Sequence, residues 1–144
     1  MRVAPLVAGI ALGMATALQS PGALACGHCV EDKIAAVYDH AMVTRSLAVK
    51  HRVAFFAIDG ALATDEAARR MIERTAEGSR GVDAGSARAS AEAAALAVAF
   101  DPERAPLATV QRGLERKFAG KRLSLLLLRV MDKPAQFKAA DLKP

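Results

Sequence analysis

The chain has 144 residues, the size of one domain, and 53% of them are hydrophobic, which excludes both a multidomain assembly and a chain that is disordered throughout. Its formal net charge of +5 comes from basic residues that are interleaved with acidic ones along the sequence. With no Trp and a single Tyr, the sequence lacks the stacking aromatics that single-strand binders place among basic residues. We therefore expect no nucleic-acid partner.

The first 25 residues have the pattern of a secretory signal. Met1 and Arg2 precede an almost wholly apolar run, 3–18, and Ala23-Leu24-Ala25 matches an A-x-A cleavage site. Because the run is shorter than the roughly 20 apolar residues of a membrane span, we expect cleavage before Cys26, a periplasmic or secreted location and no transmembrane segment in the mature chain. Lipidation of Cys26 is the alternative, although Ala23 stands where the lipoprotein motif carries Leu, Val or Ile.

All the cysteines and histidines lie shortly after this signal. Both cysteines belong to Cys26-Gly27-His28-Cys29, and the remaining histidines are His40 and His51. Two thiolates at this spacing converge on one soft ion, and imidazole suits the same metals. Cys26, Cys29 and His28 are therefore predicted to bind Cu(I) or another soft ion, with zinc as an alternative. A structural disulfide remains open because the compartment is oxidising, and His40 and His51 are expected to be ordinary surface or partly buried residues.

The segment 30–47 is predicted to form one helix. Its apolar residues recur at helical spacing, and neither Gly nor Pro interrupts them. This helix would begin directly after Cys29, where the helix dipole and free N–H groups stabilise a thiolate over a thiol. That effect serves metal binding and disulfide exchange equally.

Six further elements are expected, in the order strand, helix, strand, strand, helix, strand. Their expected ranges are 53–58, 65–77, 82–89, 96–100, 107–119 and 123–131, the last as a well-buried strand. This order matches a split βαβ arrangement, in which two right-handed crossovers place both helices on one face of an antiparallel sheet. The sequence thus predicts an α+β, ferredoxin-like βαββαβ domain over 52–132. The motif and N-terminal helix, 26–51, precede it, and a flexible tail, 133–144, follows.

Three short motifs in the segment 52–131 resemble those of the heavy-metal-associated domain. They are Asp59-Gly60 after the first strand, Gly81-Val82 before the second and Val98-Ala99-Phe100-Asp101 at the end of the third. The resemblance implies a ferredoxin-like fold and the handling of a soft metal ion. Members of that family end the first strand with Gly-Met-x-Cys-x-x-Cys, whereas this chain reads Gly60-Ala61-Leu62-Ala63-Thr64-Asp65-Glu66. Because this loop lacks Cys and Met, cysteine ligation would have to come from Cys26 and Cys29.

The tetrad Cys-Gly-His-Cys is also similar to the active-site tetrad of protein disulfide isomerases, which implies thiol-disulfide redox chemistry as an alternative. In that family the tetrad follows a strand of a thioredoxin-like fold, whereas here only the predicted signal precedes it. No Ser/His/Asp arrangement, phosphate-binding loop or suggestive carboxylate pair is present, so we expect a protein that is not an enzyme. The main hypothesis is an exported soft-metal carrier with another periplasmic protein as partner. Besides the thiol-disulfide redox protein, the other alternative is a protein-interaction module with a structural disulfide.

Overall fold

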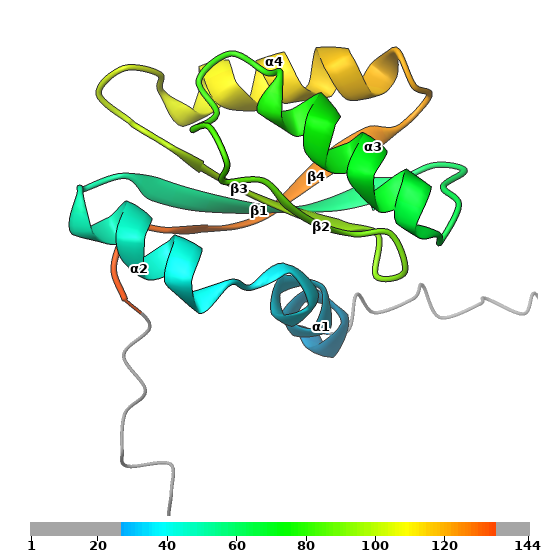
Figure 1. The fold of residues 1–144 in the computed structure, drawn as a ribbon, viewed down its shortest axis with the longest axis horizontal. Coiled ribbons are helices and arrows are strands. Elements are labelled where there is room, and N and C mark those ends of the chain that lie inside the picture. Colours follow the sequence, from blue (N-terminus) through cyan, green and yellow to red (C-terminus); the bar gives the residue numbers. More distant parts are fainter. Residues whose placement is uncertain (1–26, 135–144) are drawn as a thin grey trace, which may run out of the picture.

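The computed structural model describes residues 27–134 and has three layers, with a sheet between two pairs of helices (Figure 1). The elements are α1 (Gly27–Val37), α2 (His40–Ala48), β1 (Arg52–Asp59), α3 (Glu66–Glu77), β2 (Arg88–Ser90), β3 (Ala95–Phe100), α4 (Leu107–Ala119) and β4 (Ser124–Met131). Within this described part, no helix is long and apolar enough to cross a membrane.

The sheet has the strand order β2-β3-β1-β4, and every neighbouring pair is antiparallel. Helix α3 connects β1 to β2 and α4 connects β3 to β4, and both helices lie on the same face of the sheet (Figure 1). This connectivity and strand order define the ferredoxin-like arrangement. The predicted α+β, ferredoxin-like fold class is therefore confirmed.

The central strands are buried on both faces because helices cover both. On one face, alternate residues of β1 such as Phe56 pack with α3 and α4. On the other face, Phe55 packs with residues of α1 and α2 such as Ile34 and Met42. Strand β3 is buried at every position, and its alanines lie in the cluster under α1 and α2. Small side chains on that face let the two N-terminal helices approach the sheet closely.

The N-terminal segment consists of two helices, so the prediction of one helix over 30–47 is wrong. The chain leaves helical conformation at Tyr38 and Asp39, and Asp39 has extended backbone angles. The Asp39 carboxylate accepts a hydrogen bond from the Met42 N–H at 3.0 Å and so caps α2. Its other oxygen accepts from Arg88 Nε of β2 at 2.7 Å. These two bonds stabilise the break without Gly or Pro.

The second strand is shorter than predicted. The expected strand 82–89 is only β2, Arg88–Ser90, preceded by an isolated bridge between Val82 and Phe100. In between, Glu77 of α3 accepts hydrogen bonds from the N–H groups of Gly85 and Ala87. Because a side chain rather than a strand satisfies these donors, the segment remains a loop.

Strand β4 is also not the well-buried strand that its apolar sequence predicted. It forms one edge of the sheet and pairs only with β1. Its residues are partly or fully exposed, and the Leu126 side chain is 65% exposed. A bulge adds Leu128 between Leu127 and Arg129, which pair with the consecutive residues Phe56 and Phe55.

The exposed face of α3 is an ion-paired surface. Arg69 pairs with Glu66 and Glu73, and Arg70 also pairs with Glu66. The hydrogen bonds from Arg69 and Arg70 lower the pKa of Glu66 to about 2. Pairs of this kind at i, i+3 and i, i+4 support a solvated helix and carry no binding function by themselves.

Candidate functional site

The predicted metal motif lies at the start of α1. The helix begins at Gly27, so the backbone of His28 and Cys29 forms its first turn rather than preceding it. Cys26 lies outside the described residues. The ligand roles of Cys26, His28 and Cys29 therefore stay predictions, whereas the position of the helix that carries the motif is given by the structure.

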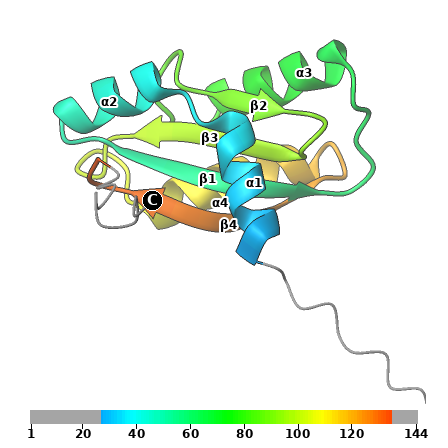
Figure 2. The ribbon, with the colours of Figure 1, turned by 90° about the horizontal axis from the view of Figure 1, so that it is seen from below.

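Three contacts fix α1 across the second face of the sheet. Near its N-terminus, Glu31 forms an ion pair with Arg129 of the edge strand β4. Two residues later, Lys33 Nζ donates to the main-chain oxygens of Ala93 and Ala94, in the turn between β2 and β3. Beyond its C-terminus, Asp39 binds β2 through Arg88, so α1 runs from the β4 edge to the β2 edge (Figure 2). The first turn of α1 consequently lies at the β4 side of the molecule.

The bonds at Asp39 also affect its charge. The pKa of its carboxyl is below the ordinary value of 3.8, chiefly because the Met42 N–H and then the Arg88 guanidinium donate to the ionised form. Asp39 therefore remains ionised, and keeps both helices attached, in all but acidic solution.

The loop after β1, where the resembling family carries its thiols, has a structural role here. Gly60 has a φ of +125°, and a Cβ there would lie 2.8 Å from the main-chain oxygen of Arg122. Asp65 ends the loop by capping α3 through the Ala68 N–H at 2.8 Å. The glycine and the cap fix the path of the chain, and no residue from 60 to 66 is a soft-metal ligand.

His51 belongs to a cluster that sequence analysis missed. Its Nδ1 lies 2.6 Å from a carboxylate oxygen of Asp83, and its Nε2 lies 3.8 Å from Asp101. The imidazole thus links the start of β1 to the loop before β2 and to the end of β3. The expectation of an ordinary histidine overlooked this link, since its members are far apart in sequence and share no motif spacing.

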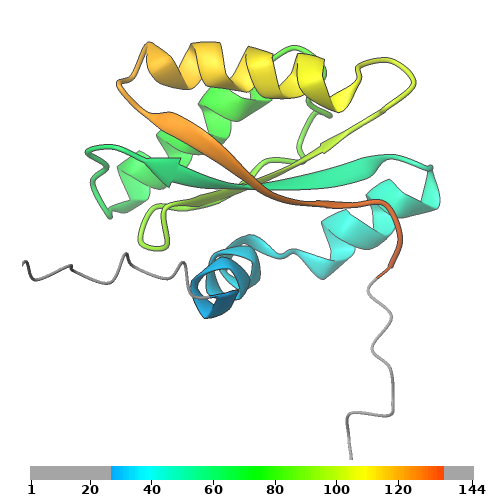
Figure 3. The same cartoon turned by 180° about the vertical axis from the view of Figure 1, so that it is seen from behind.

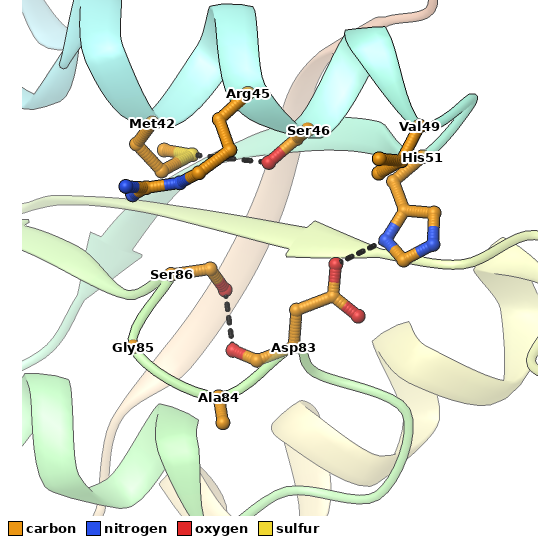
Figure 4. A pocket seen from close by; sticks show the side chains of 9 residues that line it. All are labelled: Met42, Arg45, Ser46, Val49, His51, Asp83, Ala84, Gly85 and Ser86. Carbon is orange, nitrogen blue, oxygen red and sulfur yellow. Dashed lines mark hydrogen bonds and ion pairs between the residues drawn. The ribbon is translucent and has the colours of Figure 1, made fainter.

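A pocket of about 260 Å³ lies beside this cluster, between α2 and the loop 83–86 (Figure 4). The Arg45 side chain projects across it from α2, and the Ser86 hydroxyl donates to the main-chain oxygen of Asp83 at 2.7 Å. Ser86 also accepts from the Ala99 N–H at 3.0 Å, which ties the loop to β3. The polar groups here are largely paired with one another, so the arrangement is typical of a structural brace.

His40 lies apart from His51 and opens α2 as an exposed residue. Its ring centroid is 6.4 Å from that of Tyr38, and both residues line a pocket of about 540 Å³ whose wall includes Val43 and Leu47. Over the residues that the structure describes, no three His, Cys, Asp or Glu side chains are close enough to hold a metal ion. His40 and His51 are not brought together.

The comparisons with known proteins are sparse. No protein-family model matches this chain, and no curated protein matches it. Among solved structures, oxidized MerP from Ralstonia metallidurans CH34 is similar, with a TM-score of 0.44 and 16% sequence identity over 55% of this chain and 99% of that chain. The strand order and the two crossovers define the ferredoxin-like fold independently of this similarity.

Proposed function

We propose that the chain is an exported carrier of a soft metal ion of the Cu(I) type and not an enzyme. Cys26 and Cys29 supply two thiolates, and His28 is the third ligand or a positive neighbour that favours them. The supporting observation is that the chain's only two cysteines form one C-x-x-C motif, whose second cysteine, Cys29, lies in the first turn of a helix packed on the sheet. A helix N-terminus stabilises thiolates, the form that binds soft metals.

The ferredoxin-like domain then serves as the scaffold. It carries the thiols on α1 instead of on the loop after β1, which contains neither Cys nor Met. A relationship to the heavy-metal-associated family would therefore be one in which the metal ligands occupy the opposite face of the sheet. Export, predicted by the first 25 residues, belongs to the same proposal and is tested by the intact mass of the protein recovered from the periplasm.

The proposal is tested by competition for Cu(I) between the reduced chain and a chromophoric chelator under anaerobic conditions. We expect one tight site that Cys29→Ser or Cys26→Ser weakens at least about 100-fold, since each change removes one of two thiolate ligands. His28→Asn should weaken binding less, and its matched control, His40→Asn, should leave it unchanged. Stoichiometric, tight Cu(I) binding by Cys29→Ser would overturn the proposed function.

A further inference from the structure

The outer surface of the layer that α3 and α4 form is basic. The two helices lie side by side over one face of the sheet, in the view from the front and in the view from behind (Figure 1 and Figure 3). Basic and acidic residues are interleaved along the sequence, but the fold separates them in this layer. Its basic surface consists of five exposed residues, Arg74, Arg80, Arg112, Arg116 and Lys117.

Three arginines of the basic surface lie on the side of their helix that faces away from the sheet. Because each residue of a helix turns it by about 100°, Arg112 and Arg116 lie about 200° around α4 from the fully buried Leu114. Arg74 has the same relation to the fully buried Ile72 of α3. All three guanidinium groups are therefore on the solvent side of the layer.

Arg80 and Lys117 lie where the two helices meet. A Cβ at Gly113 would lie 3.6 Å from the main-chain oxygen of Arg80, which places Arg80 beside the middle of α4. The Lys117 ammonium group donates to the main-chain oxygen of Gly78, at the end of α3. These two residues thus connect the outward-facing arginines of the two helices into one continuous surface.

The acidic residues of the same helices have partners elsewhere. Glu73 and Glu77 of α3 accept hydrogen bonds from main-chain N–H groups of the segment 85–89, on the β2 side of the layer. On α4, Glu115 accepts a hydrogen bond from Gln111 at 2.8 Å. Within the described part of the chain, no member of the basic surface forms an ion pair. The surface therefore carries five positive charges without an ionic partner among these residues.

The pair Arg112 and Arg116 does not stabilise α4. The two residues are one turn apart, a spacing at which like charges repel and destabilise a helix. Their Nε groups donate to main-chain oxygens of α4 at 3.2 and 3.4 Å, and their terminal nitrogens form no hydrogen bond with a described residue. Arginine can present such nitrogens to two oxygens of one phosphate at the same time. This pair thus has the chemistry of a phosphate-binding site rather than of a helix-stabilising contact.

We propose that the basic surface binds the anionic headgroups of a phospholipid membrane. A stable protein interface needs large apolar or aromatic side chains at its centre. Among the described residues, the large hydrophobic side chains that are exposed are Tyr38, Val49 and Leu126, and none of them belongs to this layer. A lipid surface needs only clustered positive charge, which the five residues supply. A chain bound in this way would turn α1, on the other side of the sheet, toward the solvent (Figure 1).

The proposal is tested by co-sedimentation with lipid vesicles. The mature chain is produced without residues 1–25, so that no lipid is attached to it, and is mixed with vesicles of phosphatidylglycerol and phosphatidylcholine in equal parts. Each basic residue near an anionic surface raises the partition coefficient about fivefold, so Arg112→Gln with Arg116→Gln should weaken binding about 25-fold. The matched control is Lys50→Gln with Lys133→Gln, two exposed residues after α2 and after β4. It should change binding less than about twofold in about 0.1 M salt, where attraction is screened beyond about 10 Å.

Binding should be lost on vesicles of phosphatidylcholine alone and should weaken at least about tenfold when the salt concentration rises to about 0.5 M. Equal binding to both kinds of vesicle would overturn the proposal, as would equal effects of the two double variants. Because Gln and Arg have similar helix propensities, urea unfolding of Arg112→Gln with Arg116→Gln should match that of the wild type and exclude a loss of fold. Retention of the chain on immobilised polyglutamate without binding to the vesicles would overturn the lipid partner in favour of an acidic protein.

Discussion

Replacing Asp39 tests how the N-terminal helices are attached to the domain. One carboxylate oxygen caps α2 at 3.0 Å from the Met42 nitrogen, and the other accepts from Arg88 at 2.7 Å. A lost cap costs about 1 kcal/mol. Because both side chains of the ion pair are 32% exposed, we discount its contribution for solvent screening to about 0.5 kcal/mol. Asp39→Ala should therefore lower the free energy of unfolding by about 1.5 kcal/mol.

Two variants separate these contributions in urea unfolding followed by circular dichroism. Asp39→Asn keeps a capping oxygen and loses the charge, so it should cost only about 0.5 kcal/mol. Asp65→Ala removes a cap of the same kind, at 2.8 Å from the Ala68 nitrogen, and should cost about 1 kcal/mol. Equal losses from Asp39→Asn and Asp39→Ala would refute the capping argument. A smaller loss of unfolding free energy from Asp39→Ala than from Asp65→Ala would show that the Asp39–Arg88 ion pair with β2 adds no stability.

Three further predictions concern acid, the histidines and the glycines. The pKa of Asp39 is lowered from 3.8, so its contribution to the free energy of unfolding is fully present above that value and is lost as the pH falls through the folded pKa. In unfolding measured at stepped pH, the wild type should therefore lose stability more steeply below about pH 4 than Asp39→Asn. Parallel curves would contradict this. His51→Ala should cost about 1 kcal/mol in urea unfolding through the lost bond to Asp83, whereas exposed His40→Ala should cost almost nothing, and equal costs would count against the brace. Gly81→Ala should destabilise more than Gly85→Ala, by about 1–3 kcal/mol, because only at Gly81 does a Cβ meet Ala105 and Val110, at 2.8 and 2.9 Å; equal melting temperatures would show that the site relaxes.

The elements that could be predicted from the sequence are those whose periodicity and end signals agree. Strand β1 is an apolar run closed by Asp59-Gly60, and α3 and α4 have apolar stripes that end at Gly78 and Gly120. Their order was sufficient to predict the ferredoxin-like fold. The break between α1 and α2 was missed because an apolar stripe passes across it. The capping residue Asp39 was its only local signal.

Other features depend on contacts between distant residues and have no local pattern. The segment 82–87 has a weak alternation of small residues that favours a strand, but hydrogen bonds of Glu77 and Ser86 stabilise a loop there. The leucines of β4 resemble a buried strand in sequence, although an edge position follows from the strand order. The candidate thiol site stands on sequence alone, since its side chains lie outside what the structure describes.

The alanine-lined face of β3 has a consequence for how firmly α1 is attached. Among the described side chains of α1, only Ile34 and Val37 are buried, and they pack against small residues such as Ala95 and Ala97. Burial of two such side chains contributes at most about 3–6 kcal/mol to the free energy of folding. This is less than burial of the larger core on the other face of the sheet contributes. Amide hydrogens of α1 should thus exchange with solvent through a local opening, well before those of β1 and β3. Helix α1, which includes Cys29, is then the part of the described structure that can leave the sheet while the rest stays folded.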